Sequence, residues 1–437
     1  MKEESENRNL STWFSQLFGR TETTAPAAGI LLMKSRILMW TVASCLFAAL
    51  AIPAGLTAQD NPDHKPTITT FEVPGGGTGF RQGTLPTAIN PKGTITGYYI
   101  DASGVAHGFL RDCDWERRGK ECKEGGGTIT TFDAPVASTG PGLGTFPIAI
   151  NGTGEITGYY YGADFWTHGF LRTHDGSLTT FDVPGGGPGG GTVPAGINPA
   201  GEITGYFLNN VSLAFDGFVH APNGTLTTFD DPDAGSGSFQ GTFVFGESTF
   251  TTNNGGINAA GAIAASYIDA SNAGHGFLRS RDGTFTTFDV TDGSQTSPTA
   301  IGLDNAIAGI YFQAIAGNPF GGNYRGFLRK PDGSFSTFDA ATYPPCCIWT
   351  FAVAINPEGK ITGYDNDGQS INHGFLRDGN GTITKFDAPG AGTAPNQGTV
   401  AVAINPEGAI TGFYYDASDV SHGFVREGDR EDRFRPR

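Results

Sequence analysis

The sequence predicts an all-β protein that folds as a single seven-bladed β-propeller, with four antiparallel strands per blade. Three observations lead to this prediction. Four short segments recur in the same order in seven tandem repeats of 48 to 61 residues. Each segment is rich in β-branched and aromatic residues and is bounded by turn residues. The composition, with 67 glycines, 33 phenylalanines and only 16% charged residues, suits short strands better than long helices.

The first segment of each repeat is a TTFD-like strand, followed by a Gly-rich stretch. We expect this strand at the rim of its blade, and the Gly-rich stretch to cross from the rim to the centre of the next blade. Its phenylalanine recurs as Phe71, Phe132, Phe181, Phe229, Phe288, Phe338 and Phe386.

The second segment has the pattern Ala-Ile-Asn and is expected to be the innermost strand. In six repeats it ends with an asparagine, and Gly302 stands in the fifth. An Asn-Pro-x-Gly sequence that favours a type I turn follows most copies. We expect these side chains to close their own turns, and a polar ring at one mouth of the channel is the alternative. The asparagines are Asn90, Asn151, Asn198, Asn258, Asn356 and Asn405.

The third and fourth segments, such as ITGYY at 95–99 and HGFLR at 107–111, complete the blade. Asp-Gly or Asn-Gly follows the fourth segment in five repeats and signals a two-residue hairpin turn. Such a turn at Asp282-Gly283 pairs Phe277 with Phe288, and the same count places Phe opposite Phe in all five hairpins. Both faces of the hairpin are apolar, which favours a ring of blades over a two-layer sandwich. A β-solenoid is the alternative, but it would prefer shorter and more uniform repeats.

The two ends of the repeat region complement each other. The region begins with a TTFD-type strand, Ile68 to Val73, and ends with an HGFLR-type strand, His422 to Arg426. We expect these strands to pair and close the ring, because an open ring would leave two unpaired edges. The hairpin count predicts that Phe424 faces Phe71 and that His422 faces Val73.

The repeat resembles a known family. The pattern AIN-P-x-G-x-I-T-G-Y-Y, followed by D-A-S-G-V-x-H-G-F-L-R, is similar to the HAF-family extracellular repeats of bacteria, with Gly where that family has Ala. The resemblance covers residues 67–427. It implies an extracellular β-propeller-like protein and supplies no catalytic residues.

The N-terminal region predicts export. Residues 34–58 resemble a signal peptide, with a basic start, an apolar stretch and a small residue, Ala58, for cleavage. We interpret 1–33 as a mis-assigned or disordered extension, 59–427 as the propeller and 428–437 as a charged disordered tail. The expected location is secreted or periplasmic, without membrane insertion after cleavage. An uncleaved membrane anchor is the alternative.

Cysteines occur in two places in the mature chain. Cys113 and Cys122 flank a charged insert, and we expect a disulfide between them in an oxidising compartment. Cys346 and Cys347 are adjacent, and either two thiols or a vicinal disulfide would fit. No histidine lies close to either pair, so neither predicts a metal site.

Two polar positions recur near the ends of strands and are assigned structural roles. A histidine precedes Gly-Phe in five repeats, where we expect a hydrogen bond within each blade. An acid follows each TTF segment, and we expect it to accept backbone N–H bonds. Asp365 to Gly368 resembles part of a calcium loop, but it lacks the downstream glutamate and is interpreted as a turn. The histidines are His107, His168, His275, His373 and His422.

The function predicted best is that of a binding module for glycans or peptides. No catalytic, metal or cofactor motif is evident, and the formal net charge of −16 disfavours nucleic acid as a partner. A polysaccharide-active glycosidase or lyase with loop carboxylates, and a purely structural envelope protein, are the alternatives. We expect a monomer without a cofactor. The aromatic residues expected at the binding face are Phe80, Tyr99, Tyr160, Phe165, Trp166, Tyr311, Phe312 and Tyr415.

Overall fold

The computed structural model describes residues 66–112, 127–186, 191–243, 256–291, 293, 295–315, 322–340 and 349–428. All of them belong to one compact unit, Asp63–Arg437. The expected signal peptide, both cysteine pairs and the C-terminal tail beyond residue 428 lie outside the described residues. Within the described part of the chain, no helix has the length and apolarity needed to cross a membrane.

The described residues form strands and turns only, and the strands pair in groups of four that we call blades. The first blade is β2 (Gly83–Ile89), β3 (Ile95–Ile100), β4 (Ala106–Asp112) and β5 (Thr128–Phe132). The second is β6 (Thr145–Ile150), β7 (Ile156–Tyr161), β8 (Thr167–Arg172) and β9 (Leu178–Phe181). The third is β10 (Thr192–Ile197), β11 (Ile203–Leu208), β12 (Phe215–His220) and β13 (Leu226–Phe229).

The remaining blades repeat this order. The fourth is β14 (Gly241–Phe243), β15 (Ile263–Ile268), β16 (Gly274–Arg279) and β17 (Phe285–Phe288). The fifth is β18 (Gln295–Ile301), β19 (Ile307–Ala314), β20 (Gly322–Arg329) and β21 (Phe335–Phe338). The sixth is β22 (Trp349–Ile355), β23 (Ile361–Asn366), β24 (Asn372–Arg377) and β25 (Ile383–Phe386). The last blade combines β26 (Gly398–Ile404), β27 (Ile410–Tyr415) and β28 (Ser421–Arg426) with β1 (Ile68–Phe71).

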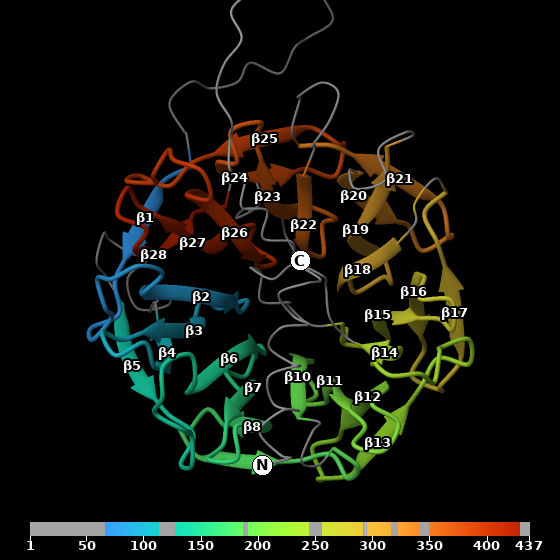
Figure 1. Ribbon diagram of the computed structural model, residues 1–437. Coiled ribbons are helices and arrows are strands. Elements are labelled where there is room, and N and C mark those ends of the chain that lie inside the picture. Colours follow the sequence, from blue (N-terminus) through green and yellow to red (C-terminus); the bar gives the residue numbers. More distant parts are fainter. Residues whose placement is uncertain are drawn as a thin grey trace, which may run out of the picture. The chain divides into compact units, whose positions relative to one another are not determined.

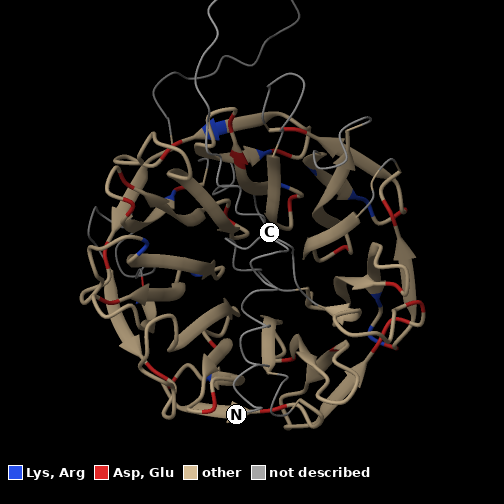
Figure 2. Cartoon of the chain, viewed as in Figure 1, with Lys and Arg blue, Asp and Glu red and all other residues tan. Residues whose placement is uncertain are grey.

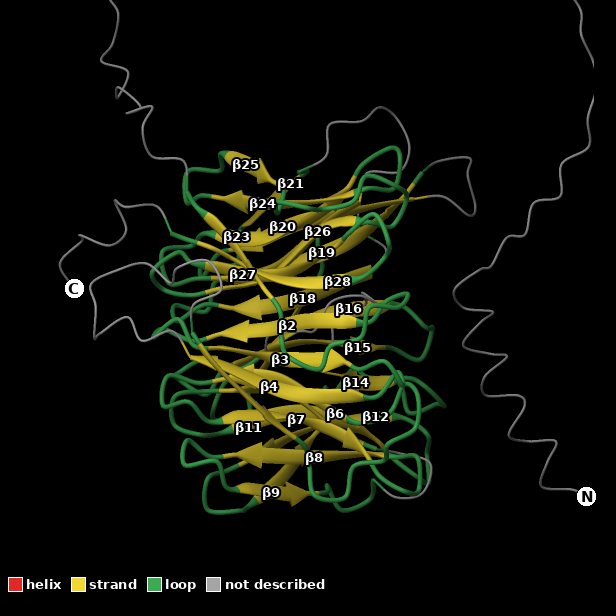
Figure 3. Ribbon diagram, turned by 90° about the vertical axis from the view of Figure 1, so that its left-hand side faces the viewer, coloured by secondary structure: helices red, strands yellow, loops and turns green. Residues whose placement is uncertain are grey.

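The blades are arranged around a central axis, as in a β-propeller (Figure 1). Within a blade, neighbouring strands are antiparallel and follow the expected order, with the Ala-Ile-Asn strand innermost. The side view shows the strands stacked blade upon blade, with loops at both of their ends (Figure 3). The inner strand of one blade contacts the second and third strands of the preceding blade, as β6 does with β3 and β4.

The first and last strands pair as expected, but in a different register. β1 pairs antiparallel with β28, so that Phe71 faces Gly423 and Thr70 faces Phe424. The predicted pairing of Phe71 with Phe424 is therefore wrong by one residue. The hydrogen-bonded ladder is also not one closed sheet, because β6–β9 form a sheet of their own.

The same one-residue difference occurs in the hairpins, and the turn explains it. In the fourth blade Phe277 faces Thr287, and Gly276 faces Phe288. Ser280 donates its N–H to the Thr284 carbonyl at 2.8 Å, so three residues form the loop instead of two. Gly283 has a φ of +93°, the conformation that closes a three-residue hairpin after a type I turn.

This register gives the glycine of each His-Gly-Phe segment a packing role. A Cβ on Gly276 would lie 2.6 Å from the Phe288 ring, so the outer-strand ring covers the glycine directly. The ring then contacts the next blade edge-to-face, at centroid distances of 6.0 to 6.5 Å. These pairs are Phe71–Phe109, Phe132–Phe170, Phe181–Phe218, Phe229–Phe277, Phe288–Phe327, Phe338–Phe375 and Phe386–Phe424.

A cation lies against most of the same rings. The arginine that ends the third strand places its guanidinium 4.6 to 5.4 Å from the ring of the preceding blade, for example Arg111 against Phe71. In the third blade His220 stacks on Phe181 instead. The hydrophobic clusters likewise combine residues of adjacent blades, such as Ala88 with Ile156 and Phe170. The core of the protein thus lies between the blades.

Candidate binding site on the loop face

One end of the strands carries two kinds of loop, and we call this end the loop face. The first kind joins the second and third strands of a blade, as residues 101–105 do. The second is the crossing segment that enters the next inner strand, as residues 72–82 do. The opposite end carries the short Asn-Pro-x-Gly and Asp-Gly turns. Among the described residues, the loops are therefore longer at the loop face than at the opposite end.

Most of the exposed large apolar side chains among the described residues lie on the loop face, whereas Leu303, exposed by 59%, lies in a turn at the opposite end. Among the described large hydrophobic residues, Val211, Phe80, Phe165 and Val136 are exposed by 89%, 74%, 69% and 61%. Leu213 is exposed by 38% beside Val211. Charged residues lie mainly in the outer part of the ring of blades (Figure 2). Large apolar groups exposed together on one face are typical of interaction surfaces.

Two of these residues adopt a backbone conformation that bulky residues rarely take. Phe165 and Leu213 have φ values of +66° and +56° in the loop between the second and third strands. Other blades have smaller residues at the same position, three of which, a glycine, an asparagine and an aspartate, are suited to this conformation. These residues are Gly104, Asn272, Ser370 and Asp419.

The crossing segments also have a left-handed position that carries a large residue in some blades and a small one in others. Arg81 and Phe239 have φ values of +59° and +64°, where other blades have Gly142 and Asn396. The two left-handed positions are joined by the backbone, because Arg81 N–H donates to the Asp419 carbonyl at 2.8 Å, and Phe239 N–H donates to that of Leu213 at 2.6 Å. Because Gly142 and Asn396 suffice in other blades, the fold needs the backbone conformation at these positions but does not require a large side chain.

The large side chains of the crossing segments pack against aromatic rings. The Arg81 guanidinium lies 3.7 Å from the centre of the Tyr415 ring and 5.5 Å from that of Phe80. Arg81 also donates to the Asn396 carbonyl at 2.9 Å. In the third and fourth blades Phe215 packs against Phe239 and Phe243.

Beneath these loops, five histidines each lie between two carboxylates. His168 places Nδ1 3.0 Å from Asp182 and Nε2 3.2 Å from Asp164. The same arrangement occurs in four other blades, with distances to the second acid of 3.3 to 3.6 Å. These clusters are Asp101–His107–Asp133, Asp269–His275–Asp289, Asp367–His373–Asp387 and Asp416–His422–Glu72.

These contacts identify the partner of the repeated acids. The acids after the TTF segments lie beside imidazoles in these five blades, whereas backbone N–H groups were expected as their partners. In the fifth blade Arg325 replaces the histidine and binds Asp339 through two hydrogen bonds of 2.7 and 2.6 Å. In the third blade Asp216 stands at this position. Burial, and then the charge of Asp216, raise the pKa of Asp230.

The predicted aromatic residues differ in exposure. Phe80 and Phe165 are exposed, and Trp166 is half-buried. Tyr160, Tyr311 and Tyr415 are at least 93% buried, while Tyr99 is half-buried and stacks on His107 with 5.0 Å between the ring centres. Phe312 is half-buried against Tyr324. Burial therefore removes three of the expected residues from the accessible surface.

The sequence did not point to Leu213, Phe239 or Arg81 as residues of the loop face. A signal was present, because these residues align with glycine or asparagine in other repeats. That signal becomes interpretable only when the position is known to need a positive φ. The alignment of repeats alone does not reveal the backbone conformation.

The asparagines at the opposite end close their own turns, as expected, and also bond to the next blade. The Oδ1 of Asn90 accepts the N–H groups of Lys92 and Thr94 in its own turn. Its Nδ2 donates to the Asn151 carbonyl of the next blade at 3.3 Å. Equivalent bonds continue around the axis and include Asn405 to Asn90. These amides are therefore occupied and buried, and they do not offer a ligand site.

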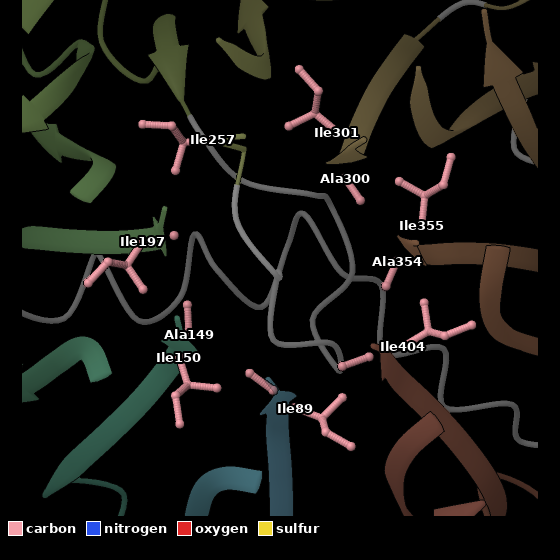
Figure 4. A pocket seen from close by; sticks show the side chains of 13 residues that line it. Ile89, Ala149, Ile150, Ile197, Ile257, Ala300, Ile301, Ala354, Ile355 and Ile404 are labelled. Atoms are coloured by element: carbon pink, nitrogen blue, oxygen red, sulfur yellow. The ribbon is translucent and has the colours of Figure 1, made fainter. Parts of the chain in front are cut away.

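A cavity of about 170 Å³ lies on the axis beside these asparagines (Figure 4). Its lining comes from the Ala-Ile pairs of the inner strands, including Ile89, Ile150, Ile301 and Ile404. Among the described residues, no group of His, Cys, Asp and Glu side chains is arranged to hold a metal ion. Asp365, from the sequence that resembled a calcium loop, belongs to β23 and binds Lys385 at 2.7 Å.

Comparison with known proteins gives structural likenesses of low similarity. No family model and no curated protein matches the chain. The β-propeller domain of the Trilobed protease from Pyrococcus furiosus is 9% identical over 65% of this chain and 94% of its own, with a TM-score of 0.35. The six-bladed Aleuria aurantia lectin, described with fucose recognition, is 14% identical over 76% and 96%, with a TM-score of 0.36. A puromycin hydrolase is 11% identical over 77% and 53%, with a TM-score of 0.42.

Proposed function

We propose that this protein is an exported, closed, seven-bladed β-propeller that binds glycans on its loop face. The pairing of β1 with β28 and the Phe71–Phe109 contact between the first and last blades support the closed ring. The apolar stretch at 37–52 with basic residues before it supports export. N-terminal sequencing of the protein from its native source tests export, because the mature chain should begin near Gln59.

The observation that carries the binding function is the pair Phe165 and Leu213. An L-residue in the left-handed conformation costs about 1–2 kcal/mol, and both side chains are exposed. Burial offsets little of this cost for Phe165, which is 69% exposed, and smaller residues occupy the same position in other blades. Strain at an exposed bulky residue is characteristic of functional sites.

The chemistry of the face favours glycans. A flat aromatic ring matches the apolar C–H face of a sugar, and nearby carboxylates accept hydrogen bonds from its hydroxyl groups. Asp164 directly precedes Phe165. Asp164 and Asp182 both contact His168, and about half of each carboxylate side chain is exposed. The net charge of −16 makes a neutral glycan a better ligand than an acidic one.

The histidine clusters favour binding over catalysis. In each of the five clusters both imidazole nitrogens lie within 3.6 Å of a carboxylate oxygen. A general base needs a free nitrogen directed at the substrate. These imidazoles hold loops in place and have no such nitrogen.

The test is a screen of the purified protein against neutral glycans, followed by calorimetry with the best ligand. Phe165→Gly and Leu213→Asn introduce residues that other blades already carry, so the fold should tolerate them. We expect each variant to weaken binding about tenfold or more, as for an aromatic or aliphatic anchor. Asn272→Gly, at the equivalent position of the fourth blade, is the matched control and should bind as the unaltered protein does.

Two results would contradict the proposal. One is the absence of binding to any glycan together with binding to peptides, which would assign the face to a peptide. The other is full glycan affinity in the Phe165→Gly and Leu213→Asn double variant, which would place the ligand elsewhere.

A further inference from the structure

The loop that carries Phe165 is held by one imidazole. Asp164 directly precedes Phe165, and its Oδ1 lies 3.2 Å from Nε2 of His168. The same oxygen accepts the N–H of Trp166 at 3.1 Å. On its other side His168 places Nδ1 3.0 Å from Asp182, which follows the outer strand β9. Phe165 therefore lies between Asp164, which His168 holds, and Trp166, which Asp164 holds.

The arrangement is complete only when His168 carries a positive charge. A protonated imidazole donates from both nitrogens, whereas a neutral one donates from one and presents a lone pair from the other. With a carboxylate at each nitrogen, loss of the proton places a lone pair against Asp164 or Asp182. One of the two contacts is then lost.

We propose that His168 is a pH-dependent latch that keeps Phe165 in its ligand-binding conformation. The latch regulates the site described under Proposed function and rests on that proposal. Protonated His168 holds Asp164 and hence the strained Phe165 backbone. Neutral His168 releases the loop, and the ligand loses a fixed aromatic surface.

The charged groups around His168 set the pH range. The titratable groups that face it from the described residues are Asp164 in the β7–β8 loop, Asp182 after β9, and Tyr160 of β7, whose ring stacks on it at 5.1 Å. Burial lowers the pKa of His168, but the hydrogen bonds and charges of Asp182 and Asp164 outweigh it, and the pKa lies above 6.5. Burial raises the pKa of Asp164, yet the Trp166 N–H and His168 bring it below 3.8.

The pKa shifts of His168 and Asp164 determine how ligand binding depends on pH. Because the pKa of His168 in the folded protein is raised, the latch is intact at pH 6.5 and is lost as the pH rises through the folded value. Because the pKa of Asp164 is lowered, the latch also persists down to about pH 3.8. Binding should therefore be strongest in mildly acidic solution and should weaken as the pH rises from 6.5 through the pKa of His168 in the folded protein.

In the fifth blade a side chain that does not titrate takes the place of the histidine. Arg325 takes the place of the histidine there and binds Asp339 through two nitrogens. The hydrogen bonds that Arg325 donates to Asp339 raise its pKa further, so it stays charged at every relevant pH. The chain thus provides the substitution for a test, which is His168→Arg.

The experiment measures glycan affinity and amide hydrogen exchange of residues 162–168 from pH 5 to pH 9. In the unaltered protein we expect affinity to fall about two- to fivefold on the alkaline side, the size expected for partly exposed ion pairs. Exchange of these amides, corrected for the intrinsic effect of pH, should rise in the same range. His168→Arg should remove both changes, and His168→Gln should show the alkaline behaviour at every pH.

His275→Arg is the matched control, because its loop carries Asn272 where Phe165 stands in the second blade. It should leave the pH dependence of binding unchanged. Binding that is independent of pH in the unaltered protein would overturn the latch while leaving the proposed function intact. Loop exchange that responds to pH in a protein that binds no glycan would instead support the latch and refute the proposed function.

Discussion

Phe165 and Leu213 show how a single residue departs from the repeat that surrounds it. Their positions demand a left-handed backbone, and other blades supply Gly104 or Asn272. The Phe165 side chain is 69% exposed, so it costs backbone energy and gains little burial, while Leu213 is 38% exposed. The departure is therefore best explained by contact with something outside the chain.

The strained backbone at Phe165 should lower the stability of the folded protein. Phe165→Gly relieves about 1–2 kcal/mol of strain, of which roughly 0.5–1 kcal/mol is offset by the greater freedom of glycine in the unfolded chain. We expect a net gain of about 0.5–1 kcal/mol in the free energy of unfolding, measured by urea denaturation. Asn272→Gly is the comparison and should show no gain. A clear loss of stability in Phe165→Gly would mean that the phenyl ring packs against the protein and that strain is not the explanation.

Residue by residue, the sequence identified part of this face. Phe80 and Phe165 were expected to be accessible because they lie in the loops that vary most in length, and both are exposed. Tyr160 and Tyr415 were expected there for the same reason, but strand periodicity directs them into the protein. The alternation of a strand does not say which of its two faces a neighbouring blade covers.

At the scale of strands and turns, the hairpin between the third and fourth strands decides the packing. The Asp-Gly sequence identified the turn, but not that the loop has three residues. A one-residue difference moves every partner along the ladder and replaces Phe277 opposite Phe288 with Gly276 opposite Phe288. The glycine that precedes the buried phenylalanine is thus required for space, because the outer-strand ring occupies the volume of its missing side chain.

This close approach predicts a strong effect from one methyl group. A Cβ on Gly276 would lie 2.6 and 3.0 Å from two carbons of the Phe288 ring. The ring is held between blades and cannot move freely, so Gly276→Ala should lower the free energy of unfolding by about 1–3 kcal/mol. Gly274→Ala in the same strand is the matched control, because its nearest contact would be 3.4 Å from the Gln295 side chain. Equal melting temperatures for the two variants would show that the ring yields.

At the scale of the whole molecule, each blade depends on its neighbour. The outer-strand phenylalanine of one blade packs on the third strand of the next, and an arginine of that strand covers its ring. Phe71, near the start of the described chain, makes the same contact with Phe109 and Arg111. If the ring is closed in solution, Phe71 stabilises the protein as much as a phenylalanine inside the array does.

The comparison of Phe71→Ala with Phe229→Ala tests this equivalence. The two rings are 5% and 9% exposed and have matching partners. Each variant should lose about 3 kcal/mol in the free energy of unfolding, the lower end for a buried phenylalanine. A much smaller loss for Phe71→Ala would show that the first strand frays and that the ring is open.

The sequence predicted the architecture better than the contacts that hold it together. Repetition of four segments gives the blade and its strand order, and the unmatched strands at the two ends give the pairing of β1 with β28. The bonds from Asn90 to Asn151 and onward were not foreseeable in detail, because a repeat shows which residue recurs but not which part of the neighbour it reaches. Contacts between identical units become visible only in three dimensions.

β1 is the outer strand of the last blade, and this brings the two ends of the propeller together. Glu427 donates its N–H to the Thr67 carbonyl at 3.0 Å, so the two ends of the propeller are direct neighbours. A short linker joining them, with new termini opened in the turn at Asp282-Gly283, would preserve every strand pairing in a circularly permuted protein. In this fold the order of the repeats around the axis is structural, whereas the point at which the polypeptide starts is arbitrary.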